Sequence, residues 1–137
     1  MSVGKRGTVY WERNETIALT LLDEGWVEND KNGRIVRHFG VVRWYHIGRG
    51  QRWPETCIRG DCPICMKGHD PKKRFLATFS VGGKTAKVSV TPYMDRVLGR
   101  LVEECVRSGQ DPRGRTVLVT YGPGPGMWAA SWVGDQA

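Results

Sequence analysis

Three cysteines lie close together in the segment CIRGDCPICMKGH. Cys62 and Cys65 have two residues between them, the spacing with which two thiolates on a tight turn bind one tetrahedral ion. Cys57 would supply a third sulfur, and a structural zinc site then needs a fourth ligand. No further cysteine is near, so a histidine should complete the site. The spacing alone allows either His46 or His69.

A second chemistry is open to the same residues, because Cys-x-x-Cys is also the motif of thiol–disulfide exchange enzymes. Such a motif normally opens a helix within a βαβ unit. Here Gly68, Asp70 and Pro71 would cut a helix short, and a third cysteine lies nearby. The segment therefore favours structural zinc over redox chemistry. A closed four-ligand site leaves no open position for catalysis, and no paired carboxylates or phosphate-binding loop are visible, so we do not expect an enzyme.

The cysteines also bear on the cellular compartment. The N-terminal MSVGKRGTVYWERN has no apolar signal segment, and no apolar run approaches membrane-spanning length. We therefore expect a cytoplasmic protein without a membrane partner, in which clustered cysteines are reduced. Cys105 is separate from the cluster and is expected to be a small core residue on a helix.

The elements around the cysteine segment are mostly strands. TIALTLLD and RIVRHFGVVRWYHI read as strands, with Asn32-Gly33 as a turn between them and Gly40 as a bend within the second. RFLATFSV and KTAKVSV flank Gly82-Gly83 as a second hairpin. RTVLVTY and MWAASWV are two further strands near the C-terminal end.

One helix is predicted, over TPYMDRVLGRLVEECVRSG. Thr91 can cap its first turn, Pro92 suits its first position and Gly109 can end it. The order of elements fits a single domain, residues 1–137, with a five-stranded Greek-key barrel of the OB type, whose helix lies between strands three and four. A β-sandwich with one helix would produce similar sequence patterns. Residues 46–74 would then be an inserted zinc-binding loop.

The positive charge of the chain is localised. The net charge is +7, and the segment from Arg34 to Arg74 contains ten Lys or Arg against three acidic residues. The remaining residues carry equal numbers of each sign. Such a concentration is the electrostatic footprint of a polyanion-binding surface, and nucleic acid is the expected partner.

The segment YHIGRGQRWPETCIRGDCPICMKGHDPKKRFLATFSV resembles the zinc-containing core of phage single-stranded DNA-binding proteins, of which the helix-destabilising protein of the T-even phages is a member. The family pattern is a histidine at a strand end, a cysteine, and then Cys-Pro-x-Cys. The resemblance, which extends more weakly over residues 34–133, implies an OB barrel with an inserted zinc loop. It implies His46, Cys57, Cys62 and Cys65 as the ligands. It also implies a role in phage DNA replication, recombination and repair in the host cytoplasm, with replication or recombination proteins as further partners.

A sequence-tolerant binder of single strands needs cations for phosphates and aromatic rings for bases. KKRF lies where the family has a basic and aromatic strand that contacts DNA. The candidate phosphate contacts are Arg37, Arg43, Arg49, Arg52, Lys72, Lys73 and Arg74, and the candidate stacking residues are Tyr45, Trp53 and Phe75. We assign the other aromatic residues considered to the core: Trp26, Phe39, Trp44, Phe79, Trp128 and Trp132. The main alternative function is a zinc-ribbon module that binds duplex DNA, RNA or a polymerase.

Overall fold

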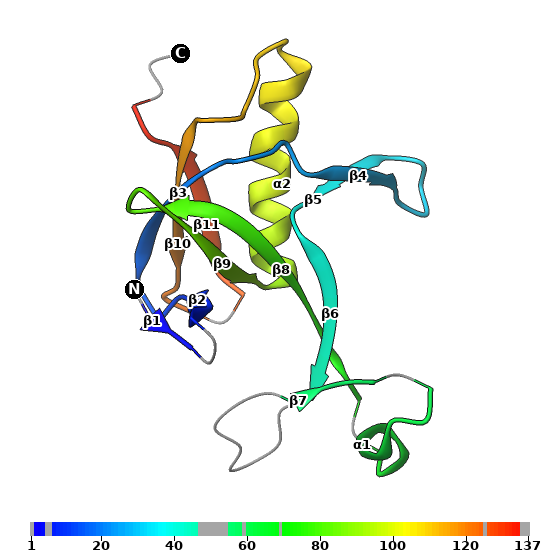
Figure 1. The fold of residues 1–137 in the computed structure, drawn as a ribbon. Helices are drawn as coiled ribbons and strands as arrows, with labels where there is room; N and C mark the ends of the chain where they lie inside the picture. The colour runs from blue at the N-terminus through cyan, green and yellow to red at the C-terminus, as the bar shows by residue number, and fades with distance from the viewer. Residues whose placement is uncertain are drawn as a thin grey trace.

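The computed structural model describes residues 2–4, 7–46, 55–58, 60–68, 70–124 and 126–134. Strands dominate these residues, and two helices accompany them, so the predicted mainly β class is confirmed. Figure 1 shows a curved sheet beside the long helix α2, with a separate hairpin to one side and two strands extending away from the body. No helix within the described residues is long and apolar enough to cross a membrane.

The main sheet has the strand order β1-β2-β9-β8-β3-β10-β11, and β6 pairs with both β8 and β7. Within the described residues β1 and β11 end this order and do not pair, so the sheet is not closed into a barrel. The strands of this sheet are β1 (Ser2–Val3), β2 (Val9–Tyr10), β3 (Thr16–Thr20), β6 (Val41–His46), β7 (Glu55–Thr56), β8 (Lys72–Val81), β9 (Lys84–Val90), β10 (Thr116–Tyr121) and β11 (Trp128–Trp132).

The first predicted hairpin forms a sheet of its own, β4 (Trp26–Asn29) with β5 (Ile35–His38), closed by the turn that contains Gly33. The single strand expected over residues 34–47 is instead two strands, because the chain bends at Gly40. Gly40 has a φ of 85°, and an added Cβ would run into the backbone of Leu76 on β8. This close crossing separates the hairpin from β6.

The helix α2 (Pro92–Arg107) begins and ends as predicted. The hydroxyl of Thr91 accepts a hydrogen bond from the Met94 amide at 3.1 Å, and Gly109 follows the helix with a positive φ of 84°. Its apolar face packs on the sheet and buries Leu98, Val102 and Cys105. The main core is formed by Leu19, Leu21, Phe39, Phe75, Phe79, Val88, Val90, Met94, Leu98, Val102, Val117 and Val119.

The cysteine segment lies at the far end of an arm formed by β6 and the first half of β8, residues 41–46 and 72–76. These strands pair in antiparallel register from Val41 opposite Leu76 to Tyr45 opposite Lys72. Figure 1 shows the arm leading away from α2 to β7 and the short helix α1 (Pro63–Met66). The described residues of the expected insertion that lie between β6 and β8, 55–58, 60–68 and 70–71, are therefore carried at the end of a two-stranded stem.

Candidate metal centre and basic strand face

Four potential ligands converge at the end of the arm. His46 is the last residue of β6, Cys57 follows β7, Cys62 precedes α1 and Cys65 lies within α1. His46, Cys57 and Cys62 are buried, and Cys65 is partly exposed. The amide of Cys57 donates to the carbonyl of Trp44 at 2.8 Å, so strand pairing itself brings Cys57 beside the end of β6. The four residues that the resemblance implied are thus brought together, while His69 lies outside the described residues.

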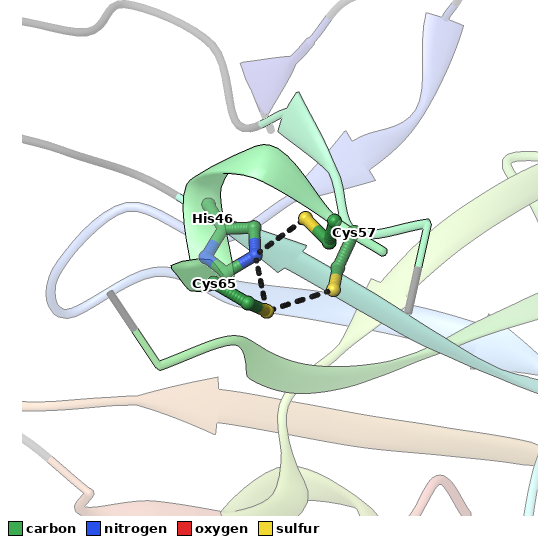
Figure 2. Close-up of side chains that lie close together, drawn as sticks. His46, Cys57 and Cys65 are labelled. Atoms are coloured by element: carbon green, nitrogen blue, oxygen red, sulfur yellow. Dashed lines mark hydrogen bonds between the residues drawn. The ribbon is translucent and has the colours of Figure 1, made fainter. Parts of the chain in front are cut away.

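The geometry of this cluster fits one tetrahedral ion. The four ligand atoms lie within 4.8 Å of one another. His46 Nε2 lies 3.5 Å from Cys62 Sγ and 3.4 Å from Cys65 Sγ. The sulfur atoms of Cys57 and Cys65 are 3.6 Å apart, which is too far for a disulfide of about 2.05 Å. Figure 2 shows the side chains of His46, Cys57 and Cys65 directed toward one another. A tetrahedral site with metal–sulfur bonds of about 2.3 Å has sulfur–sulfur edges of about 3.8 Å and sulfur–nitrogen edges of about 3.5 Å. The three distances between Cys57 and Cys65, His46 and Cys62, and His46 and Cys65 agree with these edges.

The other nitrogen of the imidazole lacks a partner. His46 is 3% exposed, and its Nδ1 has no hydrogen-bond partner among the described residues. Metal-binding histidines usually donate a hydrogen bond from this second nitrogen to a carboxylate, a carbonyl or water. The assignment of the site therefore rests on the convergence of the four donor atoms and not on this nitrogen.

The protein environment acts in opposite ways on two of the thiols. A hydrogen bond from the Cys65 backbone, with smaller ones from Ile58 and Ile64, lowers the pKa of Cys62 to about 6. Desolvation, followed by the nearby thiols of Cys57 and Cys62, raises the pKa of Cys65 to about 11. Three adjacent thiolates need a cation to offset their repulsion, which a bound metal ion supplies.

The side of the arm opposite the cluster carries most of the described basic candidates. Directly paired residues of antiparallel strands point to the same side, and residues two apart on one strand share a face. Arg43 pairs with Arg74 and Tyr45 with Lys72, so these four side chains lie on one face, which we call the outer face. His46 and Cys57 point to the other face. The metal cluster and the basic surface therefore use the two sides of the same strands.

Hydrogen bonds hold the central cation of the outer face in place. Arg74 Nε donates to Tyr45 Oη at 2.6 Å, and Arg74 Nη1 donates to Ser89 Oγ on β9 at 3.1 Å. The guanidinium carbon lies 5.3 Å from the centroid of the Tyr45 ring. Arg43 and Lys72 are exposed beside this pair. The outer face thus presents an ordered arginine and tyrosine flanked by two solvated cations.

Comparisons with protein-family models, curated proteins and solved structures gave no significant match. The site is therefore interpreted from its own geometry.

Two of the predicted nucleic-acid contacts do not fit their positions in the structure. Arg37 is 8% exposed, and it donates to Glu103 Oε1 from Nε and Nη2 and to the Glu24 carbonyl from Nη1. Phe75 is 2% exposed and stacks on His38 inside the protein. Neither side chain has a free surface for a phosphate or a base, so we remove both from the candidate contacts.

The remaining candidates are placed differently. Lys73 lies on the inner side of the arm, with its ammonium 5.0 Å from the centroid of the Phe75 ring. Arg49, Arg52 and Trp53 lie outside the described residues. Of the aromatic residues assigned to the core, Phe39 and Phe79 are buried in it, and the partly buried Trp128 and Trp132 pack against it. Trp26 is 39% exposed on β4, and Trp44 is partly exposed on β6 outside the core cluster.

Sequence reasoning missed two features of this region. Ser89 was not considered, although it anchors Arg74, because its pairing to β8 depends on the register of the second hairpin. His38 was also missed. It lies between Asp95 Oδ2, 2.6 Å from its Nδ1, and Glu28 Oε1, 2.7 Å from its Nε2. No local signal in the sequence predicts that contact between β5 and α2.

Proposed function

We propose that this chain binds single-stranded DNA with little sequence preference, in DNA replication, recombination or repair, and that a structural zinc ion orders its binding surface. One observation carries the proposal. The ligands His46 and Cys57 lie on one side of β6, and the cations and aromatic ring of the outer face lie on the other side. A metal ion that holds the end of β6 on the cluster side would therefore also hold the outer face in a fixed geometry.

The choice of zinc rests on the donor set. Three cysteine sulfurs and one imidazole are the ligands of closed structural zinc sites, and thiolates disfavour hard cations such as Mg²⁺ and Ca²⁺. A bound zinc ion would cross-link β6, the segment after β7, and α1. The arm projects from the core, so this cross-link would replace the packing that the loop lacks.

The outer face has the two components that a sequence-tolerant single-strand binder needs. Arg43, Lys72 and Arg74 would contact phosphates, and the hydrogen bonds to Arg74 reduce the entropy that it loses on binding. Tyr45 would stack on a base, an interaction of about 1–3 kcal/mol that every base can make. None of these roles needs a catalytic group, so we propose a binding protein and not an enzyme.

The order of elements supports an OB-type fold as part of the proposal. The hairpin β8–β9 precedes α2, and the hairpin β10–β11 follows it, which is the position of the helix between the third and fourth strands of that fold. In such folds the surface around the second and third strands commonly binds oligonucleotides. The outer face lies on the strands β6 and β8 that precede the helix.

A competition titration tests the proposed function. Fluorescently labelled oligo-dT is bound to the protein, and unlabelled oligo-dT, duplex DNA and RNA compete for it, with zinc measured on the same sample. The proposal expects oligo-dT to compete best and zinc to be present at one equivalent per chain. Stronger competition by duplex DNA or RNA would instead support a zinc-ribbon module. Thiol–disulfide exchange activity without stoichiometric zinc would support a redox enzyme.

A further inference from the structure

The arm and the cysteine segment also carry exposed aliphatic side chains that the charge pattern does not explain. Ile58 is 68% exposed and Val41 is 54% exposed, values high for large apolar residues in this chain. Single exposed apolar residues are common on protein surfaces and need no explanation. The position of these two, however, is specific.

Strand register places Val41 beside the cations. Val41 is two residues before Arg43 on β6, so the two share a face. Thr56 pairs with Tyr45, and the hydrogen bond from Cys57 to Trp44 extends that register by one residue. Ile58 follows Cys57 directly, at the end of this paired segment.

Cys57 and Ile58 are neighbours in sequence that differ in exposure. Cys57 is 6% exposed and belongs to the metal cluster, whereas Ile58 is 68% exposed. The hydrogen bond that contributes to positioning a metal ligand therefore lies next to an exposed apolar side chain.

This arrangement has a consequence for the ligand. A surface for polyanions in general needs only cations, and exposed aliphatic groups among them would add nothing. Unpaired nucleotides carry phosphates together with bases whose faces gain free energy when they leave water. Resting on the proposed function, we propose that Val41 and Ile58 form, with Tyr45, a base-contacting surface, so that the arm selects unpaired nucleotides over other polyanions.

The test compares two ligands of equal charge. Oligo-dT and an oligomer of the same length made of abasic sites have the same phosphates, but only oligo-dT has bases. Binding of each is followed by fluorescence anisotropy for the wild type, Val41→Ser, Ile58→Ser and the double variant. Val27→Ser is the matched control, because Val27 is 50% exposed on β4 of the separate hairpin. The zinc content of each variant is measured alongside.

We expect Val41→Ser and Ile58→Ser each to weaken oligo-dT binding about fivefold, through loss of buried apolar area. Affinity for the abasic oligomer and zinc content should stay unchanged, and Val27→Ser should behave as the wild type. Wild-type affinity for oligo-dT should also exceed that for the abasic oligomer.

Failure of this inference differs from failure of the proposed function. If the wild type binds oligo-dT and the two serine variants bind it equally well, or lose both ligands equally, the base-contacting role is wrong while single-strand binding stands. A change of oligomeric state in those variants with unchanged oligo-dT affinity would assign Val41 and Ile58 to a protein contact. If the wild type does not bind oligo-dT, the proposed function itself fails.

Discussion

At the scale of single residues, side-chain type was a good guide to the ligands and a poorer guide to the DNA contacts. Cysteine and histidine have few alternative uses at such density, so spacing and the resemblance were sufficient to identify the cluster. Arginine and phenylalanine also serve other purposes. Phe75, Ala77 and Phe79 alternate with outward residues on β8, and this period of two was the available signal that Phe75 is buried. No comparable signal revealed the pairing of Arg37 with Glu103.

The metal cluster predicts different roles for two buried cysteines. Cys62→Ser removes one of the four ligands, so the purified variant should contain much less than one equivalent of zinc by elemental analysis. Cys105→Ser is the control, because Cys105 is buried on α2 away from the cluster. Its zinc content should equal that of the wild type. Full zinc occupancy in Cys62→Ser would show that the ligand set is wrong.

Helix propensity and tertiary packing predict opposite effects on stability for the substitution Gly99→Ala in α2. Gly99→Ala should stabilise a free helix by about 1 kcal/mol. In this structure an added Cβ would collide with the backbone carbonyl oxygen of Arg37, so we expect a loss of about 2 kcal/mol or more in urea denaturation. Arg100→Ala, at the next and exposed position, should change stability little. A more stable Gly99→Ala variant would contradict the close packing of β5 on α2.

At the scale of elements, the strands, the hairpin turns and α2 could be predicted because their signals are local. Alternation, turn glycines and helix caps all act within a few residues. The bend at Gly40 was predicted, but the separation of β5 and β6 into different sheets was not, because it depends on the close crossing of Gly40 with β8, far along the sequence. The attachment of the β4–β5 hairpin to α2 likewise depends on partners distant in sequence, such as His38 with Asp95.

That attachment predicts a large effect of one carboxylate on stability. Asp95 is 3% exposed, its Oδ1 accepts from the Phe39 amide at 3.1 Å, and its Oδ2 contacts His38. Asp95→Ala leaves these buried groups without their partner, so unfolding free energy should fall by about 2–3 kcal/mol in urea denaturation. Asp111→Ala is the control, since the exposed Asp111 forms an ion pair with Arg113, two residues away, and should matter far less. Equal effects of the two substitutions would mean that the hairpin is held in another way.

At the scale of the whole molecule, composition predicted a mainly β protein with a localised positive charge, and the structure places part of that charge on one face of the arm. Whether the sheet closes into a barrel could not be predicted, because closure depends on whether the first and last strands of the sheet pair with each other. Local patterning carries no information about that meeting.

The outer face predicts a salt-dependent affinity. Its three cations, Arg43, Lys72 and Arg74, would neutralise about three phosphates of a single strand, which gives a slope of about −2.1 for log affinity against log salt concentration. Arg43→Ala should reduce the magnitude of that slope by about 0.7, because one phosphate contact is lost. Arg113→Ala, an exposed arginine paired with Asp111 away from the arm, should leave the slope unchanged. If the affinity of the wild type for a single strand does not change with salt concentration, the outer face does not bind phosphates.

The central claim is that metal binding on one side of β6 organises a single-strand binding surface on the other. Its most direct test measures zinc content and oligo-dT affinity on one sample, before and after chelation and again after zinc is restored. The account predicts one equivalent of zinc, a loss of most of the affinity on chelation, and recovery with zinc, while circular dichroism of the core changes little. A zinc-free protein that binds oligo-dT as tightly as the zinc-loaded one would contradict the account.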